Sequence, residues 1–387
     1  NDKVPALFFA DDTLLVSKTQ GGLQILLNRF ALFCETFGLE MNHSKTKYMV
    51  MKNKGRTKGA LKVGQVTLEQ VNVFDYLGVR FSADDSWAPQ IQKSTLLISQ
   101  RGGAICRFAG NSNSYPISPA LEIYRAQAVS AATYGGELWG HSTCTLSSLS
   151  VAENNFLRNL LGLKANTPLI PLRLDLNLKP IRELCSLKPL LLWCRIWCTP
   201  ELHHYREGLR DILDNPKALS ISWLTHIKTT LSNLGLMELW ENPAAITRHS
   251  KYMIKKRFWD QYLANIESSG TCGNLTNAFM VHKNVFKFEP FLDVITCKFS
   301  RSIYVQFRYG ILPVATFTFK WNKKDDVPST KFCLKCPGKL ETYEHIFFAC
   351  PLYSRPRKLW LTPMLKSLGF KNHIEAFRVC STDTNLF

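Results

Sequence analysis

The apolar residues of this chain follow two different spacings, and the change between them near residue 86 constrains the fold more than any other feature. Before that point, short apolar runs alternate with turn residues, as in β-strands. The run from Ala6 to Val16 predicts a hairpin with Asp11 and Asp12 at its tip. Residues 22–37 carry apolar side chains three and four positions apart, which predicts a helix that ends at Gly38.

Further strands are predicted at residues 47–51, 61–71 and 74–81, so residues 1–85 form a hairpin, a helix and antiparallel strands. After Trp87 the spacing is helical, with helices expected at residues 89–107, 118–134 and 147–161. Ser118 followed by Pro119 is the expected start of the second of these, and Gly162 is the expected end of the third. Residues 168–242 predict short packed helices broken by prolines. The fold class is therefore α+β, with a mostly α-helical second part.

The charge of the chain predicts a polyanionic partner. Lysine and arginine number 48 against 30 aspartate and glutamate residues, a formal net charge of +18. Such an excess suits nucleic acid, because each neutralised phosphate releases counterions. An acidic membrane surface is the weaker alternative, since no basic helix has a clear lipid-facing side. No apolar run reaches the roughly 18 residues that cross a bilayer, so a membrane-spanning segment is excluded.

A basic run in the C-terminal third is a candidate nucleic-acid contact. Aromatic residues are interleaved with its cations, which are Lys251, Lys255, Lys256 and Arg257. Such a mixture suits phosphate binding and base stacking. It equally suits a helix with one solvated basic face and one buried aromatic face. The sequence leaves both interpretations open.

Asp11 and Asp12 are candidate metal ligands. They lie between almost wholly apolar strands, and two adjacent carboxylates repel each other unless a cation neutralises them. Mg²⁺ is the natural cation, and two such ions activate the attacking hydroxyl and stabilise the leaving oxygen in nucleotidyl transfer. As a bare motif, however, an Asp-Asp pair is more often an ordinary turn with two solvated carboxylates.

The twelve cysteines are spread along the chain and are expected to be reduced thiols and metal ligands in an intracellular protein. Four residues have the spacing C-x2-C-x8-H-x4-C: Cys333, Cys336, His345 and Cys350. Three thiolates and one imidazole close a tetrahedral Zn²⁺ site with no open position, so the site is expected to be structural. The alternative is four unrelated residues. His203 and His204 have no cysteine or acid at metal spacing and are expected to be surface residues.

Three ordered segments resemble the reverse transcriptases of non-LTR (LINE-type) retrotransposons. The first is the aromatic-Ala-Asp-Asp hairpin at residues 9–12, and the second is Gly-Leu-x-x-Asn-x-x-Lys-Thr-Lys at residues 38–47. The third is the strand that includes Tyr76 and Gly78. Residues 118–140 and 153–168 look like the helical thumb and adjoining region of these elements. The resemblance thus covers most of residues 1–165.

The resemblance implies a domain order and several residue roles. Residues 1–85 would be the C-terminal part of a polymerase palm, 86–165 a helical thumb, 166–325 a basic helical connector and 326–387 a zinc-knuckle region. Asp11 and Asp12 would hold Mg²⁺, Lys45 would be a cation beside the triphosphate, and Tyr76 and Gly78 would contact the primer. Without the resemblance, Lys45 reads as a surface lysine. The knuckle is taken to contact nucleic acid through nearby lysines and arginines.

The resemblance also implies an activity and its partners. The intact relative copies its RNA template into DNA from a DNA primer with deoxynucleotide triphosphates, in the nucleus after a cytoplasmic ribonucleoprotein stage. A further palm aspartate and the fingers are expected before Asn1, so this polypeptide alone is expected to have little polymerase activity. The alternative function is a non-catalytic, zinc-containing nucleic-acid-binding relic or domesticated protein.

Overall fold

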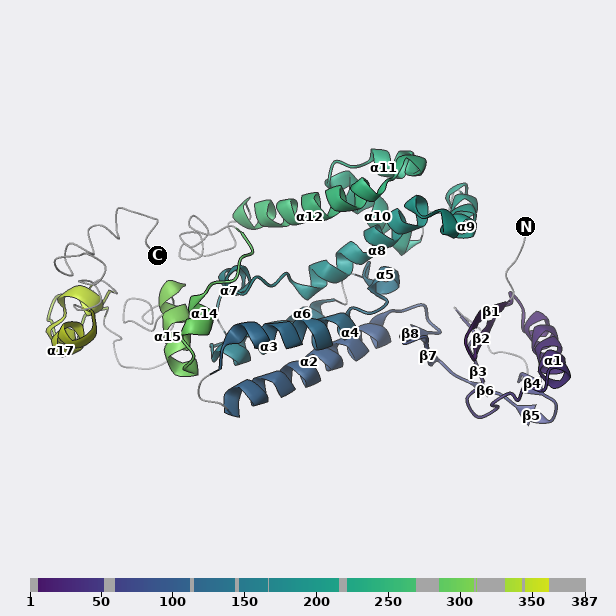
Figure 1. The fold of residues 1–387 in the computed structure, drawn as a ribbon, viewed down its shortest axis with the longest axis horizontal. Coiled ribbons are helices and arrows are strands. Elements are labelled where there is room, and N and C mark those ends of the chain that lie inside the picture. Colours follow the sequence, from purple (N-terminus) through teal and green to yellow (C-terminus); the bar gives the residue numbers. More distant parts are fainter. Residues whose placement is uncertain are drawn as a thin grey trace.

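The computed structural model describes residues 6–51, 60–111, 115–142, 146–165, 167–215, 221–268, 285–309, 311, 331–342 and 345–361. It is mixed α and β, and mostly helical. In Figure 1 the strands and helix α1 lie at one end of the longest axis, helices form the middle, and a small C-terminal module lies at the other end. None of the described helices combines the length and apolar composition that a bilayer-spanning segment requires.

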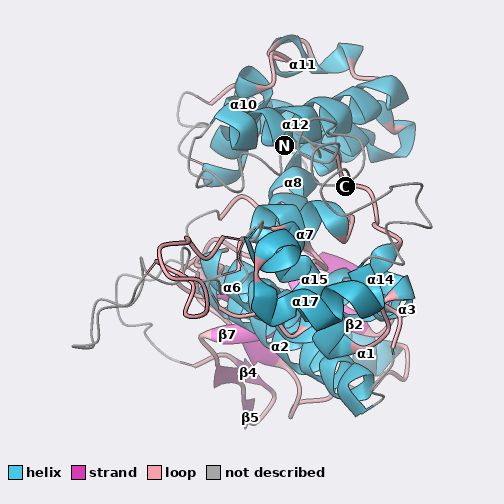
Figure 2. Ribbon diagram, turned by 90° about the vertical axis from the view of Figure 1, so that its left-hand side faces the viewer, coloured by secondary structure: helices cyan, strands magenta, loops and turns pink. Residues whose placement is uncertain are grey.

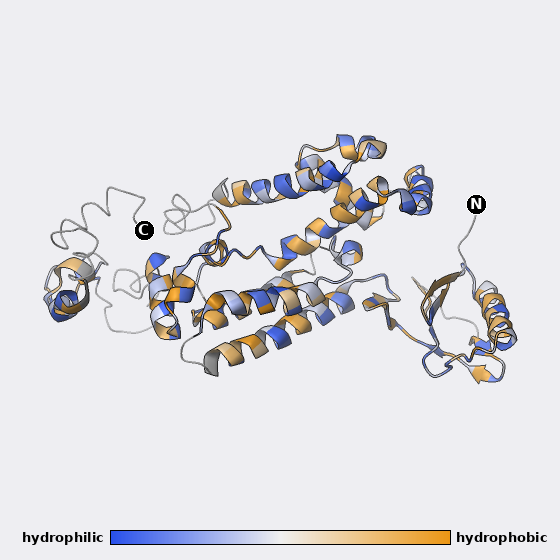
Figure 3. Ribbon diagram, in the orientation of Figure 1, coloured by the Kyte–Doolittle hydropathy of each residue, from blue (hydrophilic) through white to orange (hydrophobic). Residues whose placement is uncertain are grey.

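The N-terminal part begins with the predicted hairpin. Strands β1 (Ala6–Phe9) and β2 (Asp12–Leu15) are antiparallel, with Phe9 opposite Asp12, and Figure 3 shows both as mostly hydrophobic. Ala10 and Asp11 form the turn, in which Ala10 has a φ of 50°. The antiparallel pairing of the two strands across this two-residue turn confirms the predicted hairpin.

Helix α1 (Gln20–Thr36) begins where the Thr19 side chain accepts a hydrogen bond from the backbone N–H of Gly22. It ends, as predicted, just before Gly38, whose φ of 66° suits a residue without Cβ. Its buried side, including Leu27, packs with residues of the following strands in a small core: Leu27, Tyr48, Leu61, Val63 and Leu68. This core is separate from those of the helical part.

The short strands after α1 differ from the prediction. Strand β3 (Lys47–Tyr48) pairs in parallel with β6 (Glu69–Gln70), whereas the sequence predicts antiparallel strands. The predicted strand at 61–71 is divided into β4 (Lys62–Val63), β5 (Val66–Thr67) and β6. Gly64 has a φ of 57° and permits the tight turn between β4 and β5.

Residues 74–81 form a second hairpin, so the prediction of one strand was wrong. Strand β7 (Val73–Tyr76) is antiparallel to β8 (Val79–Ser82). Leu77 and Gly78 form the turn with φ values of 47° and 82°, the two positive values that match the twist of a hairpin. In the part of the chain that the structure describes, the strands make four two-stranded sheets rather than one larger sheet.

The three predicted long helices build the main core. Helices α2 (Ala88–Asn111) and α6 (Ser147–Leu161) pack along each other. Beside them in Figure 1 runs one continuous helical segment, made of α3 (Ile117–Ile123), the π-helical η1 (Tyr124–Val129) and α4 (Ser130–Ala132). Gly162, with a φ of 67°, ends α6 as predicted. The cap of α3 is Pro116 rather than Ser118, whose N–H donates to Asp293 at 2.8 Å.

A second set of helices packs around α8 (Ile181–Cys198). Its core contains Trp193, whose ring lies 5.2–6.5 Å from those of Trp197, Trp223 and Trp240. Figure 2 shows this set above the first core. Its other members are η2 (Pro200–Leu202), α9 (His203–Leu213), α10 (Ser222–Asn233), α11 (Glu238–Glu241), η4 (Pro243–Ala245) and α12 (Arg248–Ser268). Most are short, as predicted, but α8 itself has 18 residues and continues through Pro189, so the prediction that prolines break the helices was wrong there.

Helices from before and after the second set complete the first core. Helix α7 (Leu169–Asp175), which precedes α8, and helices α14 (Phe291–Val294) and α15 (Lys298–Arg308), which follow α12, contribute buried side chains to it, including Leu172, Leu292 and Val305. The Arg301 guanidinium donates to the carbonyls of Ile295 and Thr296. The first core therefore contains residues from both sides of position 165.

The contact between α5 (Gly136–Trp139) and α8 leads to a stability prediction. A Cβ on Gly140 would lie 2.0 Å from the carbonyl oxygen of Cys185, although the φ of −65° is open to any residue. We expect Gly140→Ala to lower the free energy of unfolding by about 1–3 kcal/mol or more, because the two backbones must separate. Urea denaturation followed by circular dichroism measures the change.

Gly103→Ala is the matched control for this prediction. Its Cβ would meet Arg107 Nη1 at an ordinary 3.6 Å within α2. Removing a glycine from a helix interior is expected to stabilise by about 0.5–1 kcal/mol. Equal stability of the Gly140→Ala variant and the wild type would contradict the close approach of α5 and α8.

Candidate functional site

The predicted zinc ligands lie in the small C-terminal module. The first two belong to a tight loop closed by a single β-bridge between Phe332 and Leu340. The Cys333 N–H donates to the Lys339 carbonyl at 2.8 Å, and Gly338 has a φ of 75° that allows the chain to reverse. Both cysteines of the C-x2-C pair are thereby held on the inner side of one turn.

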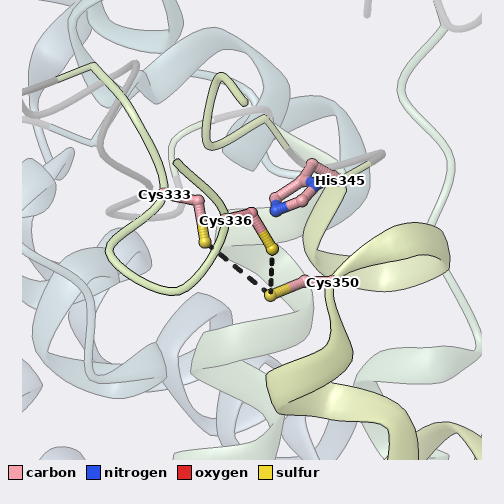
Figure 4. A group of neighbouring side chains, drawn as sticks. All are labelled: Cys333, Cys336, His345 and Cys350. Atoms are coloured by element: carbon pink, nitrogen blue, oxygen red, sulfur yellow. Dashed lines mark hydrogen bonds between the residues drawn. The ribbon is translucent and has the colours of Figure 1, made fainter. Parts of the chain in front are cut away.

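The other two ligands are held by a short helical turn. Segment η5 (His345–Ala349) starts where the His345 N–H donates to Thr342 Oγ1 at 3.2 Å, and it ends where the Cys350 N–H donates to the His345 carbonyl at 2.6 Å. The π-helical geometry brings His345 and Cys350, five positions apart, to the same side. The C-x2-C loop and η5 therefore face each other (Figure 4).

The ligand atoms of the four residues lie within 4.8 Å of one another. Cys350 Sγ is 3.7 Å from Cys333 Sγ and 4.0 Å from Cys336 Sγ. A tetrahedral Zn²⁺ with bonds of about 2.3 Å has sulfur–sulfur edges of about 3.8 Å. These distances are far longer than a disulfide bond of about 2.05 Å. The sulfur positions thus fit a tetrahedral zinc site and not a disulfide.

Two further observations fit a cation at this centre. His345 Nε2 is buried and makes no hydrogen bond, which is costly unless a metal takes its lone pair. The backbone N–H of Lys335 is the main group that lowers the pKa of the Cys333 thiol to about 7, so its thiolate is accessible near neutral pH. Burial and the neighbouring sulfurs raise the pKa of Cys336 to about 11. A dication would offset that repulsion between thiolates.

The surface of the C-terminal module at residues 331–361, which we call the zinc module after its candidate site, is basic. Lysine and arginine side chains are exposed around the cluster at Lys331, Lys335, Lys339, Arg355 and Lys358. Arg357 differs, because its guanidinium donates to the carbonyls of Ile346 and Cys350 and so ties η7 (Arg357–Leu361) to the cluster. Arg357 is therefore a structural residue of the module rather than a surface cation.

Asp11 and Asp12 lie at the hairpin tip, as the sequence predicts. Asp11 is in the turn and Asp12 is the first residue of β2, and both side chains are exposed. Hydrophobic side chains next to them are also exposed, including Phe8 and Phe9 at 63% each. In Figure 1 this hairpin and the zinc module lie at opposite ends of the longest axis, so the structure does not bring these two sites together.

Lys45 lies in a loop that Asn42 organises. The Asn42 side-chain oxygen accepts hydrogen bonds from Ser44 Oγ and the Lys45 N–H, and its carbonyl accepts from the N–H and the hydroxyl of Thr46. Asn42 and Thr46 therefore fix the turn that exposes Lys45 just before β3. This gives the Asn-x-x-Lys-Thr part of the motif a physical role in shaping the loop.

Tyr76 and Gly78 are positioned by the second hairpin. Tyr76 ends β7, and the carbonyl of Gly78 accepts a hydrogen bond from Lys93 Nζ of α2 at 2.9 Å. A Cβ on Gly78 would lie 3.0 Å from the Tyr134 ring, so this turn packs closely on the helical part. The hairpin is thus anchored to the helical part, and the predicted primer contact stays a prediction.

The basic run predicted as a nucleic-acid contact lies in helix α12. Lys251, Lys255 and Lys256 are exposed, while Trp259 is buried in the core around α8 with Phe258 and Tyr262 partly buried against it. Arg257 donates to the carbonyls of Leu234 and Gly235 at the end of α10. Phe258, Trp259 and Tyr262 therefore serve packing. Solvent reaches the three lysines and also Tyr252, which is 62% exposed.

The sequence interpretation that His203 and His204 have no acid at metal spacing was wrong. Their side chains and that of Glu207 form a second group of metal-ligand type, with ligand atoms within 4.8 Å of one another on the exposed side of α9. His204 Nδ1 lies 3.8 Å from Glu207 Oε2. The i, i+3 and i, i+4 spacing to Glu207 was the signal that could have found this group. All three residues are surface residues, as expected.

Comparison with known proteins finds a partial relative. An uncharacterized transposon-derived protein of Caenorhabditis elegans is 24% identical over 165 residues. The aligned region covers 41% of this chain and 56% of that protein, so it spans little more than half of the relative's length. No protein-family model and no solved structure matches the chain. The chain is thus similar in part to a transposon-derived protein.

Proposed function

We propose that this chain is the C-terminal part of a non-LTR retrotransposon reverse transcriptase and that it binds nucleic acid through a zinc-stabilised basic module. The arrangement of Cys333, Cys336, His345 and Cys350 around one centre carries this proposal. Such a centre stabilises a small module that has little core of its own. Exposed lysines on that module supply the positive charge that phosphate binding needs.

The hairpin at residues 9–12 supports the polymerase part of the proposal. In this proposal Asp11 and Asp12 are the Mg²⁺ ligands, Lys45 is a cation on the triphosphate side, and Tyr76 and Gly78 position the primer. The substrates are an RNA template, a DNA primer and deoxynucleotide triphosphates. In this proposal the two carboxylates hold two metal ions less well than three would, so extension by this chain is weak.

Binding and primer extension test the two parts of the proposal separately. The zinc-loaded 387-residue chain is mixed with a labelled DNA primer on an RNA template, with Mg²⁺ and deoxynucleotide triphosphates. We expect retention of the hybrid in a mobility-shift assay and extension near background. Replacing Lys331, Lys335 and Lys339 by glutamine is expected to weaken binding and to reduce the slope of log K against log salt by about 0.7–0.9 for each phosphate that is no longer neutralised.

The matched control removes the same charge elsewhere. Glutamine at Lys18, Lys62 and Lys164, which are exposed in the first half of the chain, is expected to change binding less. Equally weak binding by both triple variants would show that net charge, not the zinc module, controls binding. Absence of hybrid binding by the wild type would refute the proposal.

The second candidate function, a non-catalytic nucleic-acid-binding protein, is favoured by the same zinc module and needs no hairpin chemistry. Extension that disappears in Asp12→Asn would exclude it and would show that two carboxylates suffice. Under the leading proposal we instead expect the weak extension to rise above background at high Mg²⁺ concentration and to disappear in Asp12→Asn. Tight binding with no extension by the wild type even at high Mg²⁺ concentration would favour the second candidate.

A further inference from the structure

The segment between α7 and α8 places a lysine against the basic helix α12. Lys179 is half-buried, and its Nζ lies 4.5 Å from the centroid of the Trp259 ring. Trp259 is itself buried in the core around α8, so one face of its ring contacts the ammonium group and the rest of the ring is covered by other residues. A cation on an indole face is held in place and partly removed from water.

A second lysine lies next to the first. Lys255 is exposed on α12, one helical turn before Trp259. Because Lys179 lies over the Trp259 ring, it lies beside the turn of α12 that carries Lys255. In agreement, burial and, after it, the charge of Lys255 lower the pKa of Lys179. Among the described residues, neither ammonium group has a carboxylate within salt-bridge distance. Two neighbouring cations without a carboxylate partner favour an anionic ligand.

We propose that Lys179 and Lys255 together seat one phosphodiester group of a bound nucleic-acid strand. This inference rests on the proposed nucleic-acid binding and adds a site far from the zinc module in sequence. A phosphate oxygen between the two ammonium groups replaces their repulsion with two charge-assisted hydrogen bonds. Because the Trp259 ring is buried, no base stacks on it. The two lysines therefore contact only the phosphate backbone, and this site is not specific for nucleotide sequence.

The seat predicts a specific salt dependence. We expect Lys179→Gln to weaken binding of single-stranded RNA by several-fold and to lower the slope of log K against log salt by about 0.7. Lys179→Arg keeps the charge and is expected to bind like the wild type. The double variant Lys179→Gln with Lys255→Gln is expected to lower the slope by the equivalent of about one phosphate rather than two, because both lysines share one phosphate.

Lys228→Gln is the matched control. Lys228 is also half-buried and its Nζ lies 5.8 Å from the Trp240 centroid, so it reproduces the lysine-on-tryptophan contact at another place. It is expected to leave the salt slope unchanged. Thermal unfolding of each variant, followed by circular dichroism, separates weaker binding from defective folding.

The outcomes distinguish this inference from the proposed function. An unchanged slope in folded Lys179→Gln, with weakened binding in the Lys331, Lys335 and Lys339 variant, overturns the seat and leaves the zinc-module proposal intact. A slope that falls by the equivalent of about two phosphates in the double variant overturns the shared phosphate. No RNA binding by the wild type refutes both.

Discussion

The Cys350→Ser variant is expected to lose zinc and to unfold the C-terminal module. Cys350 has 0% exposure, and its sulfur lies 3.7 Å from that of Cys333 and 4.0 Å from that of Cys336. Structural zinc contributes on the order of 10–16 kcal/mol in isolated zinc-finger peptides, and among the residues at 331–342 and 345–361 whose side chains the structure describes, only Cys333 and Cys350 are buried. Loss of a residue that only hydrogen-bonds to a metal ligand lowers metal affinity by roughly 10–100-fold. Because Cys350 is expected to bind the metal directly, we expect the Zn²⁺ affinity of Cys350→Ser to fall by more than this.

Zinc content and proteolysis measure this effect. The wild type is expected to retain one zinc ion from this site after dialysis, and the Cys350→Ser chain to lose it and to be cleaved faster between residues 331 and 361. Cys297→Ser is the matched control, because Cys297 is exposed and is the N-cap residue of α15, a position that serine suits. Stoichiometric zinc at this site in Cys350→Ser would refute the four-ligand assignment.

Elements that depend on local signals could be predicted from the sequence. The hairpin at residues 6–15 follows from apolar arms on both sides of two polar residues. Helices α1 and α6 end where Gly38 and Gly162 take positive φ values, which only a residue without Cβ adopts at low cost. The four residues of the candidate zinc site lie within 18 consecutive positions, so their spacing alone indicated the site.

Elements that depend on distant partners could not be predicted. The parallel pairing of β3 with β6 joins Lys47 to Glu69, and nothing in either two-residue strand specifies the direction of its partner. The turn at Leu77 and Gly78 was not predicted because leucine rarely takes a positive φ. Lys179 and Lys255 are brought together only by the packing of α8 against α12, which no local pattern records.

The largest effect of a polar residue on folding is expected at Asp175, at the end of α7. Asp175 has 0% exposure and accepts hydrogen bonds from Arg308 Nε at 2.9 Å and from the Tyr309 hydroxyl at 3.0 Å. Burial lowers the pKa of Arg308, but the charges of Asp175 and Glu289 together raise it by more. Burial and the Asp175 carboxylate raise the pKa of Tyr309, so its hydroxyl stays protonated. The carboxylate therefore joins α7 to α15 across 133 positions of the chain.

Asp175→Asn is expected to lower the free energy of unfolding by about 3–5 kcal/mol, because it leaves the largely buried Arg308 without its main counter-charge. Urea denaturation of the full chain measures the loss, and Asp260→Asn on the exposed side of α12 is the matched control. The double variant Asp175→Leu with Arg308→Leu removes both charges and is expected to cost less than Asp175→Asn alone. A loss below about 1 kcal/mol in Asp175→Asn would mean that Glu289, 3.7 Å from Arg308 Nη2, carries the pairing instead.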